Sequence, residues 1–180
     1  MGGAFAEGLL KSNSVKASEI TVEKFATMGA SITTDNKAAA TGADIVVIAV
    51  KPWLVEEVVT EIKPILDYKK QIIINMAAAI SSTQLFEWTA NGDDKPAIFQ
   101  IIPNIAIAVK ASMTFIVPCN ASDEQTNIIK GIFDDLGQTY LTDEQRLGAG
   151  TTLASCGIAY AMRYFRAASE GGVELGFKAD

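Results

Sequence analysis

The feature that most constrains the fold of this chain is the uninterrupted apolar run Ile45–Val50, within the stretch DIVVIAVKPW. A strand with one face in water alternates apolar and polar residues, whereas a strand covered on both faces can be apolar throughout. The run therefore predicts a strand inside a parallel sheet. It stops at Lys51-Pro52, where proline fixes φ and cannot extend a hydrogen-bonded ladder, so we expect the backbone to turn there.

Strand-like and helix-like segments alternate along the rest of the chain. Further strands are predicted at 30–34, 71–76, 97–104, 112–118 and 138–142. Helical spacing of valines and isoleucines predicts a helix that begins near Val55 and ends at Pro64. Ser-x-x-Gln capping boxes predict helix starts at Ser81 and Ser122, and Gly137 is expected to end the second of these helices. This alternation is typical of a doubly wound, mainly parallel α/β sheet.

The texture of the sequence changes after residue 142. Residues 143–177 show no strand pattern and are rich in Ala, Gly, Thr and Ser. We predict a domain boundary at this point, with an α/β domain over 1–143 and the start of a helical domain over 144–180. An apolar helix of small residues needs a packing partner, and a subunit interface is the obvious source, so we expect a homodimer or a higher homo-oligomer.

Two breaks in the pattern predict further segments of chain. Helix-like residues begin at Met1 with no strand before them, and the strand-like Ile20–Val22 passes into helical residues without a turn. Strand-to-helix connections usually take about 2–6 residues. We therefore expect additional residues before Met1, after Val22 and after Asp180.

Composition excludes several classes of function. The 180 residues include no histidine, which removes Ser-His and Cys-His catalysis and histidine-based metal sites. The formal net charge of −6 and the absence of a basic run argue against nucleic acid as a partner. No apolar run reaches the ~20 residues of a membrane span. Cys119 and Cys156 are interpreted as reduced, packed thiols of a cytoplasmic protein, with an isolated disulfide as the alternative.

Two N-terminal motifs each allow a functional and a purely structural interpretation. The glycine pair in MGGAFAEG lies at a predicted helix start, where an anion such as a dinucleotide diphosphate gains from unpaired N–H groups. Only the last glycine of a G-x-G-x-x-G fingerprint, at Gly2, is available, so local flexibility is the simpler explanation. Asp35 and Asn36 follow a predicted strand. Either residue can cap the next helix, and a contact to an adenine ribose is the functional alternative.

Predicted strand ends carry the remaining motifs. Ligands of open parallel sheets bind at the carboxyl ends of the strands. Lys51-Pro52, the three alanines 77–79 and Pro103-Asn104 all occupy such ends. In isolation, simple strand termination is the favoured explanation of Lys51-Pro52, and packing explains the alanines equally well. Cys156 lacks a neighbouring base and is not favoured as a nucleophile.

Taken together and in order, these segments resemble pyrroline-5-carboxylate reductases. The matching stretches are MGGAFAEGLL, TTDN, DIVVIAVKP, INMAAAIS, IIPN and TTLASCGIAY followed by GGVELGF, and they extend over essentially all 180 residues. The resemblance implies a Rossmann-like dinucleotide-binding domain, followed by an all-helical dimerisation domain of which only the first part is present. It also implies reduction of 1-pyrroline-5-carboxylate to L-proline, the last step of proline biosynthesis, with NADPH or NADH as hydride donor.

The resemblance assigns roles to particular residues. Glu144 matches a family position near the substrate, while the family's substrate-carboxylate loop is expected beyond Asp180, so no catalytic residue is assigned. Met1 and Gly2 would close the glycine loop, Asn36 would contact the adenine-side ribose, and the strand ends would line the diphosphate and nicotinamide. The implied cofactor-binding residues are Met1, Gly2, Asn36, Ala49, Val50, Lys51, Pro52, Met76, Ala77, Ala78, Pro103 and Asn104.

Departures from the family pattern leave alternatives open. The family usually has glycine at the position of Ala79. It usually has Pro-Asn-Thr-Pro where this chain has Pro-Asn-Ile-Ala at 103–106. It usually has serine at the position of Cys156 and proline at the position of Ile158. One rival is a dehydrogenase of the β-hydroxyacid type, which uses a lysine on the helix after the sheet, but residues 144–163 contain no lysine. A second rival is a non-enzymatic dinucleotide-binding sensor with the same fold.

Overall fold

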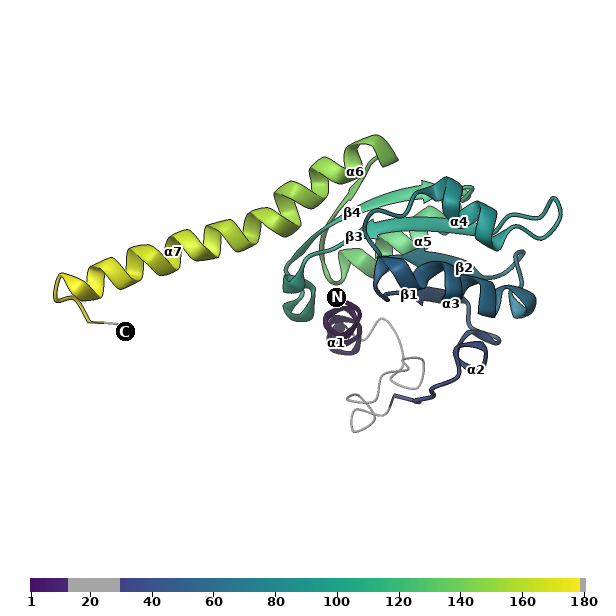
Figure 1. The fold of residues 1–180 in the computed structure, drawn as a ribbon, viewed down its shortest axis with the longest axis horizontal. Helices are drawn as coiled ribbons and strands as arrows, with labels where there is room; N and C mark the ends of the chain where they lie inside the picture. Colours follow the sequence, from purple (N-terminus) through teal and green to yellow (C-terminus); the bar gives the residue numbers. More distant parts are fainter. Residues whose placement is uncertain (13–29, 179–180) are drawn as a thin grey trace.

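The structure, a computed structural model, describes residues 1–12 and 30–178, and for residues 10–12 it describes the backbone alone. The strand predicted at Ile20–Val22 lies outside the described residues. The body of the molecule is a sheet with helices on both faces, and a long helical rod projects from it (Figure 1). The strands are β1 (Ile45–Ile48), β2 (Ile72–Asn75), β3 (Ala97–Ile102), β4 (Ser112–Cys119) and β5 (Gly137–Leu141).

Helices and short helical turns connect these strands. The α-helices are α1 (Gly2–Ser12), α2 (Asn36–Ala40), α3 (Val55–Ile62), α4 (Ser82–Thr89), α5 (Asp123–Asp134), α6 (Glu144–Gly150) and α7 (Gly157–Glu174). The 3₁₀ turns are η3 (Pro52–Leu54), η4 (Lys63–Ile65) and η5 (Ile105–Val109), and η6 (Thr151–Cys156) is a stretch of π-helix.

The strand order is β1-β2-β3-β4-β5. The pairs β1–β2, β2–β3 and β4–β5 are parallel, and only β3–β4 is antiparallel. The prediction of a mainly parallel, doubly wound sheet is therefore confirmed. Because Ile48, Asn75 and Gln100 are register partners in turn, the carboxyl ends of β1, β2 and β3 lie at one edge of the sheet.

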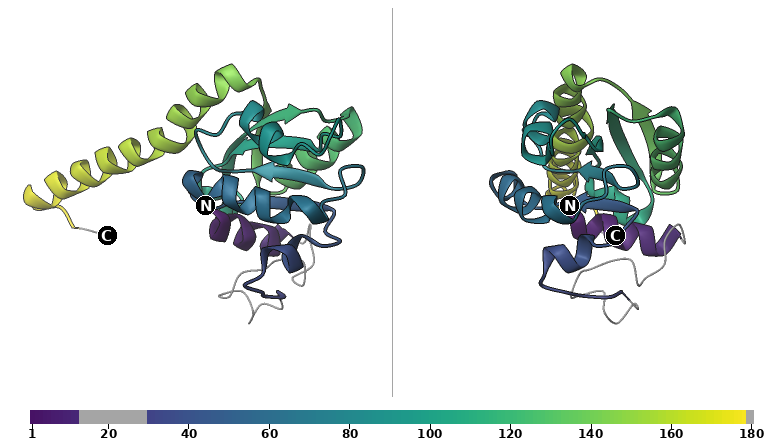
Figure 2. Two further views of the ribbon diagram at one scale, coloured as in Figure 1. Left: turned by 45° about the vertical axis from the view of Figure 1, so that its right-hand side comes forward. Right: turned by 90° about the vertical axis from the view of Figure 1, so that its right-hand side faces the viewer.

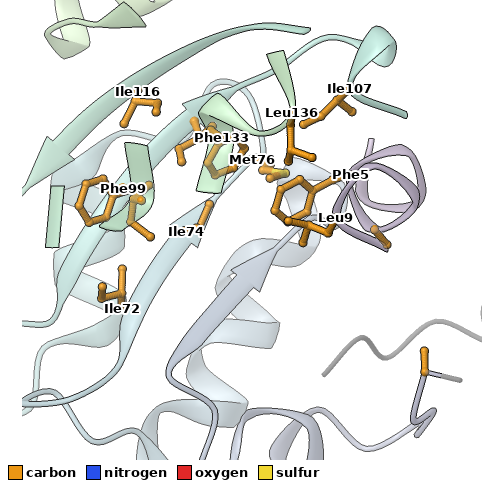
Figure 3. Close-up of a cluster of buried hydrophobic side chains, with 14 residues drawn as sticks. Phe5, Leu9, Ile72, Ile74, Met76, Phe99, Ile107, Ile116, Phe133 and Leu136 are labelled. Carbon is orange, nitrogen blue, oxygen red and sulfur yellow. The ribbon is translucent and has the colours of Figure 1, made fainter. Parts of the chain in front are cut away.

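Side chains of β1, β2 and β3 alternate between two hydrophobic layers. One layer packs Ile72, Ile74 and Phe99 against α1 and α5, and the rings of Phe5 (α1) and Phe133 (α5) stack there with centroids 5.1 Å apart (Figure 3). The other layer packs residues such as Ile73 under α3 and α4. Figure 2 shows the helices on opposite faces of the sheet. Burial on both faces explains why these strands contain so few polar residues.

The predicted helix starts are confirmed by their caps. Ser81 and Ser122 each form a full capping box with the glutamine three residues later. Asp35 caps α2, accepting hydrogen bonds from the N–H groups of Lys37 and Ala38 at 2.8 and 3.2 Å. The helix expected to run to Gly137 ends earlier, at Asp134. Gly137 instead opens β5 with a φ of 141°.

The strand predicted at 30–34 is wrong. Residues 30–33 have no regular structure, residue 34 is a bend, and residues 31–34 are exposed. Among the described residues the sheet ends at β1, and residues 30–34 have no partner strand, because they do not pair with the free edge of β1. Extended sequence patterns make strands only where such a partner exists.

The segment after β5 is helical, as predicted. α6, η6 and α7 follow one another and form the rod that leaves the sheet in Figure 1. No residue of α7 is buried, and large apolar side chains along it are exposed, including Tyr160, Tyr164 and Phe165 at 73, 71 and 62%. Cys156 is exposed as well, so the prediction that both cysteines are packed is wrong for this one.

Candidate functional site

The candidate site is the sheet edge at which β1, β2 and β3 end. The predicted segments Ala49–Pro52, Met76–Ala78 and Pro103-Asn104 each follow one of these strands, and the parallel register brings them to the same edge. Met76 continues the contact between neighbours, because its N–H donates to the carbonyl of Ile48 at 2.9 Å. The structure therefore brings together most of the residues predicted as a cofactor site.

The start of α1 adjoins this edge. A Cβ atom added to Gly2 would lie 2.9 Å from the Cβ of Ala49, which is closer than two such atoms approach, so a residue with a side chain would force the start of α1 away from the end of β1. The first N–H groups of a helix have no partner within the helix. Gly2 thus allows polar groups suited to an anion to approach the end of β1 closely. Met1, just before it, is 44% exposed.

The segment Lys51–Leu54 turns the chain from β1 into α3. Pro52 opens the 3₁₀ turn η3, and the N–H of Leu54 donates to the Lys51 carbonyl at 2.9 Å. This turn is why the apolar run ends so abruptly on Lys51-Pro52. The Lys51 side chain is exposed, and the Trp53 side chain is 75% exposed beside it.

The loop after β2 combines buried and exposed alanines. Met76 and Ala77 are buried at 7 and 6% exposure, whereas Ala78 and Ala79 are exposed. Ala79 has a φ of 63°, in the left-handed region that favours glycine. The glycine that the resemblance leads one to expect at Ala79 matches this backbone conformation.

Pro103 and Asn104 have a structural role at this edge. Both are buried, and the Asn104 side chain caps η5 by accepting a hydrogen bond from the N–H of Ala106 at 3.0 Å. The N–H of Asn104 donates to the hydroxyl of Ser112 at 3.2 Å. Asn104 therefore shapes the strand end, and its side-chain oxygen is already used in the cap.

The structure does not bring Asn36 to this edge. Its amide donates to Glu61 Oε2 at 2.8 Å, near the end of α3, whereas α3 starts next to the site. Six helical residues from Val55 to Glu61 correspond to about 9 Å along the helix axis. The role of Asn36 as a contact to the adenine-side ribose therefore stays a prediction, and its side chain lies apart from the other predicted site residues.

A cleft of about 340 Å³ opens between the loop after β2 and the helical rod. Its lining is Ala77, Ala78, Ala79, Ile80, Ser81, Gln84, Gln100, Ile102, Glu144, Leu147, Gly148 and Thr151. Of these, only Ala77, Ala78 and Glu144 were predicted as site residues. Sequence reasoning missed the others because they come from five separate segments, the loop after β2, α4, β3, α6 and η6, and only folding brings them together.

Glu144 connects the rod to the sheet domain. One carboxylate oxygen accepts a hydrogen bond from the N–H of Ser82 at 2.7 Å and the other accepts one from its hydroxyl at 2.5 Å. The carboxylate therefore binds the first turn of α4, where negative charge is stabilised. Cys119 lies nearby, and burial together with the Glu144 charge raises the pKa of its thiol to about 11, partly offset by the Ser82 hydrogen bond.

The sheet order, the glycine at the start of α1 and the small strand-end residues define a Rossmann-like dinucleotide-binding fold. The family model described as "NADP oxidoreductase coenzyme F420-dependent" matches residues 1–79. Pyrroline-5-carboxylate reductase of Pisum sativum is 28% identical over 182 residues, covering 99% of this chain and 65% of that protein. The Glycine max reductase is 31% identical over 157 residues, covering 87% of this chain and 56% of that protein. The chain is related to the pyrroline-5-carboxylate reductases.

The fold agrees with this relationship. Plasmodium falciparum pyrroline carboxylate reductase, solved with NADP bound, has a TM-score of 0.86 at 21% identity and covers 98% of this chain and 67% of its own. The chain spans between about a third and two thirds of the length of the first curated relatives it matches, at 36, 65 and 56%. Within the described residues, no helix has both the length and the apolar character needed to cross a membrane.

Proposed function

We propose that the protein reduces 1-pyrroline-5-carboxylate to L-proline, with NADPH or NADH as hydride donor. The observation that carries the proposal is the edge where the start of α1, the end of β1 and the alanine loop meet beside the cleft under α6. The family relationship supplies the substrate and the cofactor. A chain without histidine suits this reaction, because a protonated cyclic imine needs no nucleophile or histidine base.

The residues present fit a dinucleotide. The close approach that Gly2 permits leaves room for a diphosphate at the first turn of α1, an 11-residue helix. A net charge of −6 repels an anionic cofactor at long range, so these local N–H groups would have to supply the attraction. The methyl side chains of Ala77 and Ala78 would let a flat ring lie close to the backbone of the loop.

When bound, a reduced nicotinamide supplies the hydride that adds to the C=N carbon, and the imine nitrogen carries the accompanying proton. The loop after β2 and the strand ends would orient the ring, and the cleft beside them would hold the imine within reach. Holding two reactants in place can remove several kcal/mol, on the order of 7–11 at best, from a bimolecular barrier. Glu144 would act by fixing α6 over the cleft, because its carboxylate is already bound to Ser82.

The test uses purified full-length protein with NADPH or NADH, with and without 1-pyrroline-5-carboxylate. We expect dinucleotide oxidation only when the imine is present, with proline as product. Tight dinucleotide binding without turnover would favour a sensor instead. Oxidation with a β-hydroxyacid and none with the imine would favour the other dehydrogenase.

A pair of glycine variants tests where the dinucleotide binds. Gly2→Ala introduces a Cβ that must move about 0.5 Å or more from Ala49, and we expect a loss of dinucleotide affinity of about tenfold, or ~1.4 kcal/mol. Gly131→Ala, on α5, is the matched control because a Cβ there meets no atom within 4 Å. Equal affinities for the two variants would contradict the site.

We also propose that a second copy of the chain covers α7. The support is the row of exposed aromatic and apolar side chains on a helix with no buried residue of its own. Such a surface is unusual on a monomer and typical of an interface. Replacing Tyr164 and Phe165 by lysine should lower the mass measured by sedimentation, whereas Arg163→Ala should not. A wild-type protein that sediments as a monomer would refute this assembly.

A reducing compartment such as the cytoplasm is the proposed location. Its support is that both cysteines, Cys119 and Cys156, are free thiols. Fractionation of cells that express a tagged full-length protein would test it.

A further inference from the structure

Two buried amide side chains stand out in strands that are otherwise apolar. Asn75 ends β2, Gln100 lies within β3, and they are 1 and 2% exposed. They are direct cross-strand partners in the parallel register. Asn75 Nδ2 donates to Gln100 Oε1 at 2.7 Å, so the two amides form one unit under the candidate site.

This amide pair holds the backbone of the loop on both sides of Ala79. Asn75 Oδ1 accepts from the Ala77 N–H at 3.1 Å, and Asn75 Nδ2 donates to the Ala77 carbonyl at 3.0 Å. Gln100 Nε2 donates to the Ile80 carbonyl at 2.7 Å. These backbone groups have left the β-ladder, and buried polar groups need a partner. The amides supply that partner.

The loop cannot fix itself by packing. Ala77, Ala78 and Ala79 have only methyl side chains, and the last two are exposed. A residue with a side chain keeps a left-handed φ, as Ala79 does at 63°, only where the surroundings determine its conformation. The hydrogen bonds of the amide pair fix the loop backbone from the buried side of the loop. The exposed side, with Ala78 and Ala79, carries only methyl groups.

We propose that Asn75 and Gln100 are positioning residues for hydride transfer, because they hold Met76–Ile80 as a rigid floor under the nicotinamide ring. This inference rests on the proposed function. The amides act through the loop backbone: Gln100 also lines the cleft, but its side-chain oxygen and nitrogen are already bonded to Asn75 and to the Ile80 carbonyl. Since a misplacement of about 1 Å can cost ~100-fold in rate, the turnover number should depend on them more than dinucleotide affinity does.

The chain offers a matched control in Gln71. It is also a buried glutamine, at 5% exposure, and it also holds a loop: its Nε2 donates to the carbonyls of Ala40 and Ala43 at 2.8 and 2.6 Å, and its Oε1 accepts from the Asp67 N–H at 2.8 Å. It precedes β2 and therefore lies at the opposite edge of the sheet from the candidate site.

The experiment compares Gln100→Met with Gln71→Met in the full-length protein. Both variants lose buried hydrogen bonds at similar side-chain volume, so both should lower Tm. Only Gln100→Met should lower kcat, by about 10–100-fold, with the NADPH Kd changed by less than about threefold. Hydrogen exchange should accelerate in Met76–Ile80 for Gln100→Met and stay at the wild-type rate there for Gln71→Met. Asn75→Ser serves as the second variant if Gln100→Met does not fold.

Equal kcat values for Gln100→Met and Gln71→Met at comparable loss of Tm would overturn the positioning role. An unchanged exchange rate in Met76–Ile80 would overturn it as well. The exchange measurement needs no turnover, so it separates the two proposals. If wild-type protein binds NADPH but does not reduce the imine, the proposed function fails, and exchange in this loop alone decides whether the amide pair holds it.

Discussion

Ala79→Gly is expected to stabilise the protein. Ala79 has a φ of 63°, and an L-residue with a Cβ pays about 1–2 kcal/mol to adopt the left-handed region. Glycine removes this cost, but it makes the unfolded chain more flexible, which costs about 0.4–1 kcal/mol. The difference predicts a net gain of about 0.5–1 kcal/mol. The Ala79 side chain is exposed, so little packing is lost with its methyl group.

The assay is thermal or urea unfolding of wild-type and variant protein. For a chain of this length, 1 kcal/mol shifts Tm by about 2–4 °C, so Ala79→Gly should raise it by about 1–4 °C. The kcat should stay within about twofold, because the amide pair still holds Ala77 and Ile80 on either side of the substitution. A higher Tm with an unchanged kcat would show that backbone strain at Ala79 affects stability without affecting how the loop is positioned for catalysis.

Asn120→Gly is the matched control, and it should behave in the opposite way. Asn120 also has a positive φ, of 52°, but asparagine tolerates this region well. Its side-chain amide donates to the carbonyls of Lys95 and Pro96 at 3.0 and 3.2 Å, and glycine would lose both bonds. We expect its Tm to fall. A lower Tm for Ala79→Gly, or equal shifts for the two variants, would refute the argument that Ala79 is strained.

Three further predictions concern other parts of the molecule. Glu144→Gln weakens two hydrogen bonds at the start of α4 and should lower the unfolding free energy by about 1 kcal/mol in urea titrations. Since the pKa of the Cys119 thiol is raised to about 11, roughly a thousandth of it is thiolate at pH 8, so alkylation followed by mass spectrometry should label the exposed Cys156 faster, and labelling of Cys119 should rise about tenfold for each pH unit above pH 8. Gly8→Ala places a Cβ 2.3 Å from the Ile107 carbonyl oxygen, a backbone atom, and should destabilise the fold by about 1–3 kcal/mol, which calorimetry would detect.

The sheet was predictable from the sequence because its signals are local. The apolar runs at Ile45–Ile48 and Ile72–Ile74 follow from burial on both faces, and the capping boxes at Ser81 and Ser122 depend on residues only three apart. The false strand at 30–34 has an equally clear cause. A strand is stable only when another strand pairs with it, and a local pattern contains no information about its neighbours.

The candidate site was only partly predictable, for the same reason. The strand-end residues could be named because parallel strands end at one edge. Asn36, whose amide contacts Glu61 away from that edge, stays a prediction. The cleft residues Gln84 and Thr151 lie on helices whose relative position depends on the hydrogen bonds between Glu144 and Ser82 in the first turn of α4. A spacing rule within one element cannot predict a contact between residues 62 positions apart.

The amide pair shows what signal was available and overlooked. Asn75 and Gln100 are single amide-bearing residues in strands that read IIIN and AIFQII, at positions where burial favours apolar side chains. A buried amide is retained only where its hydrogen-bonding groups are paired, so two such residues opposite one another on adjacent strands imply backbone groups nearby that have left the ladder. A loop made of alanines has no long side chains that could fix its conformation. The polar residues that fix it must then be buried beneath the loop, and a sequence search for exposed catalytic side chains does not find them.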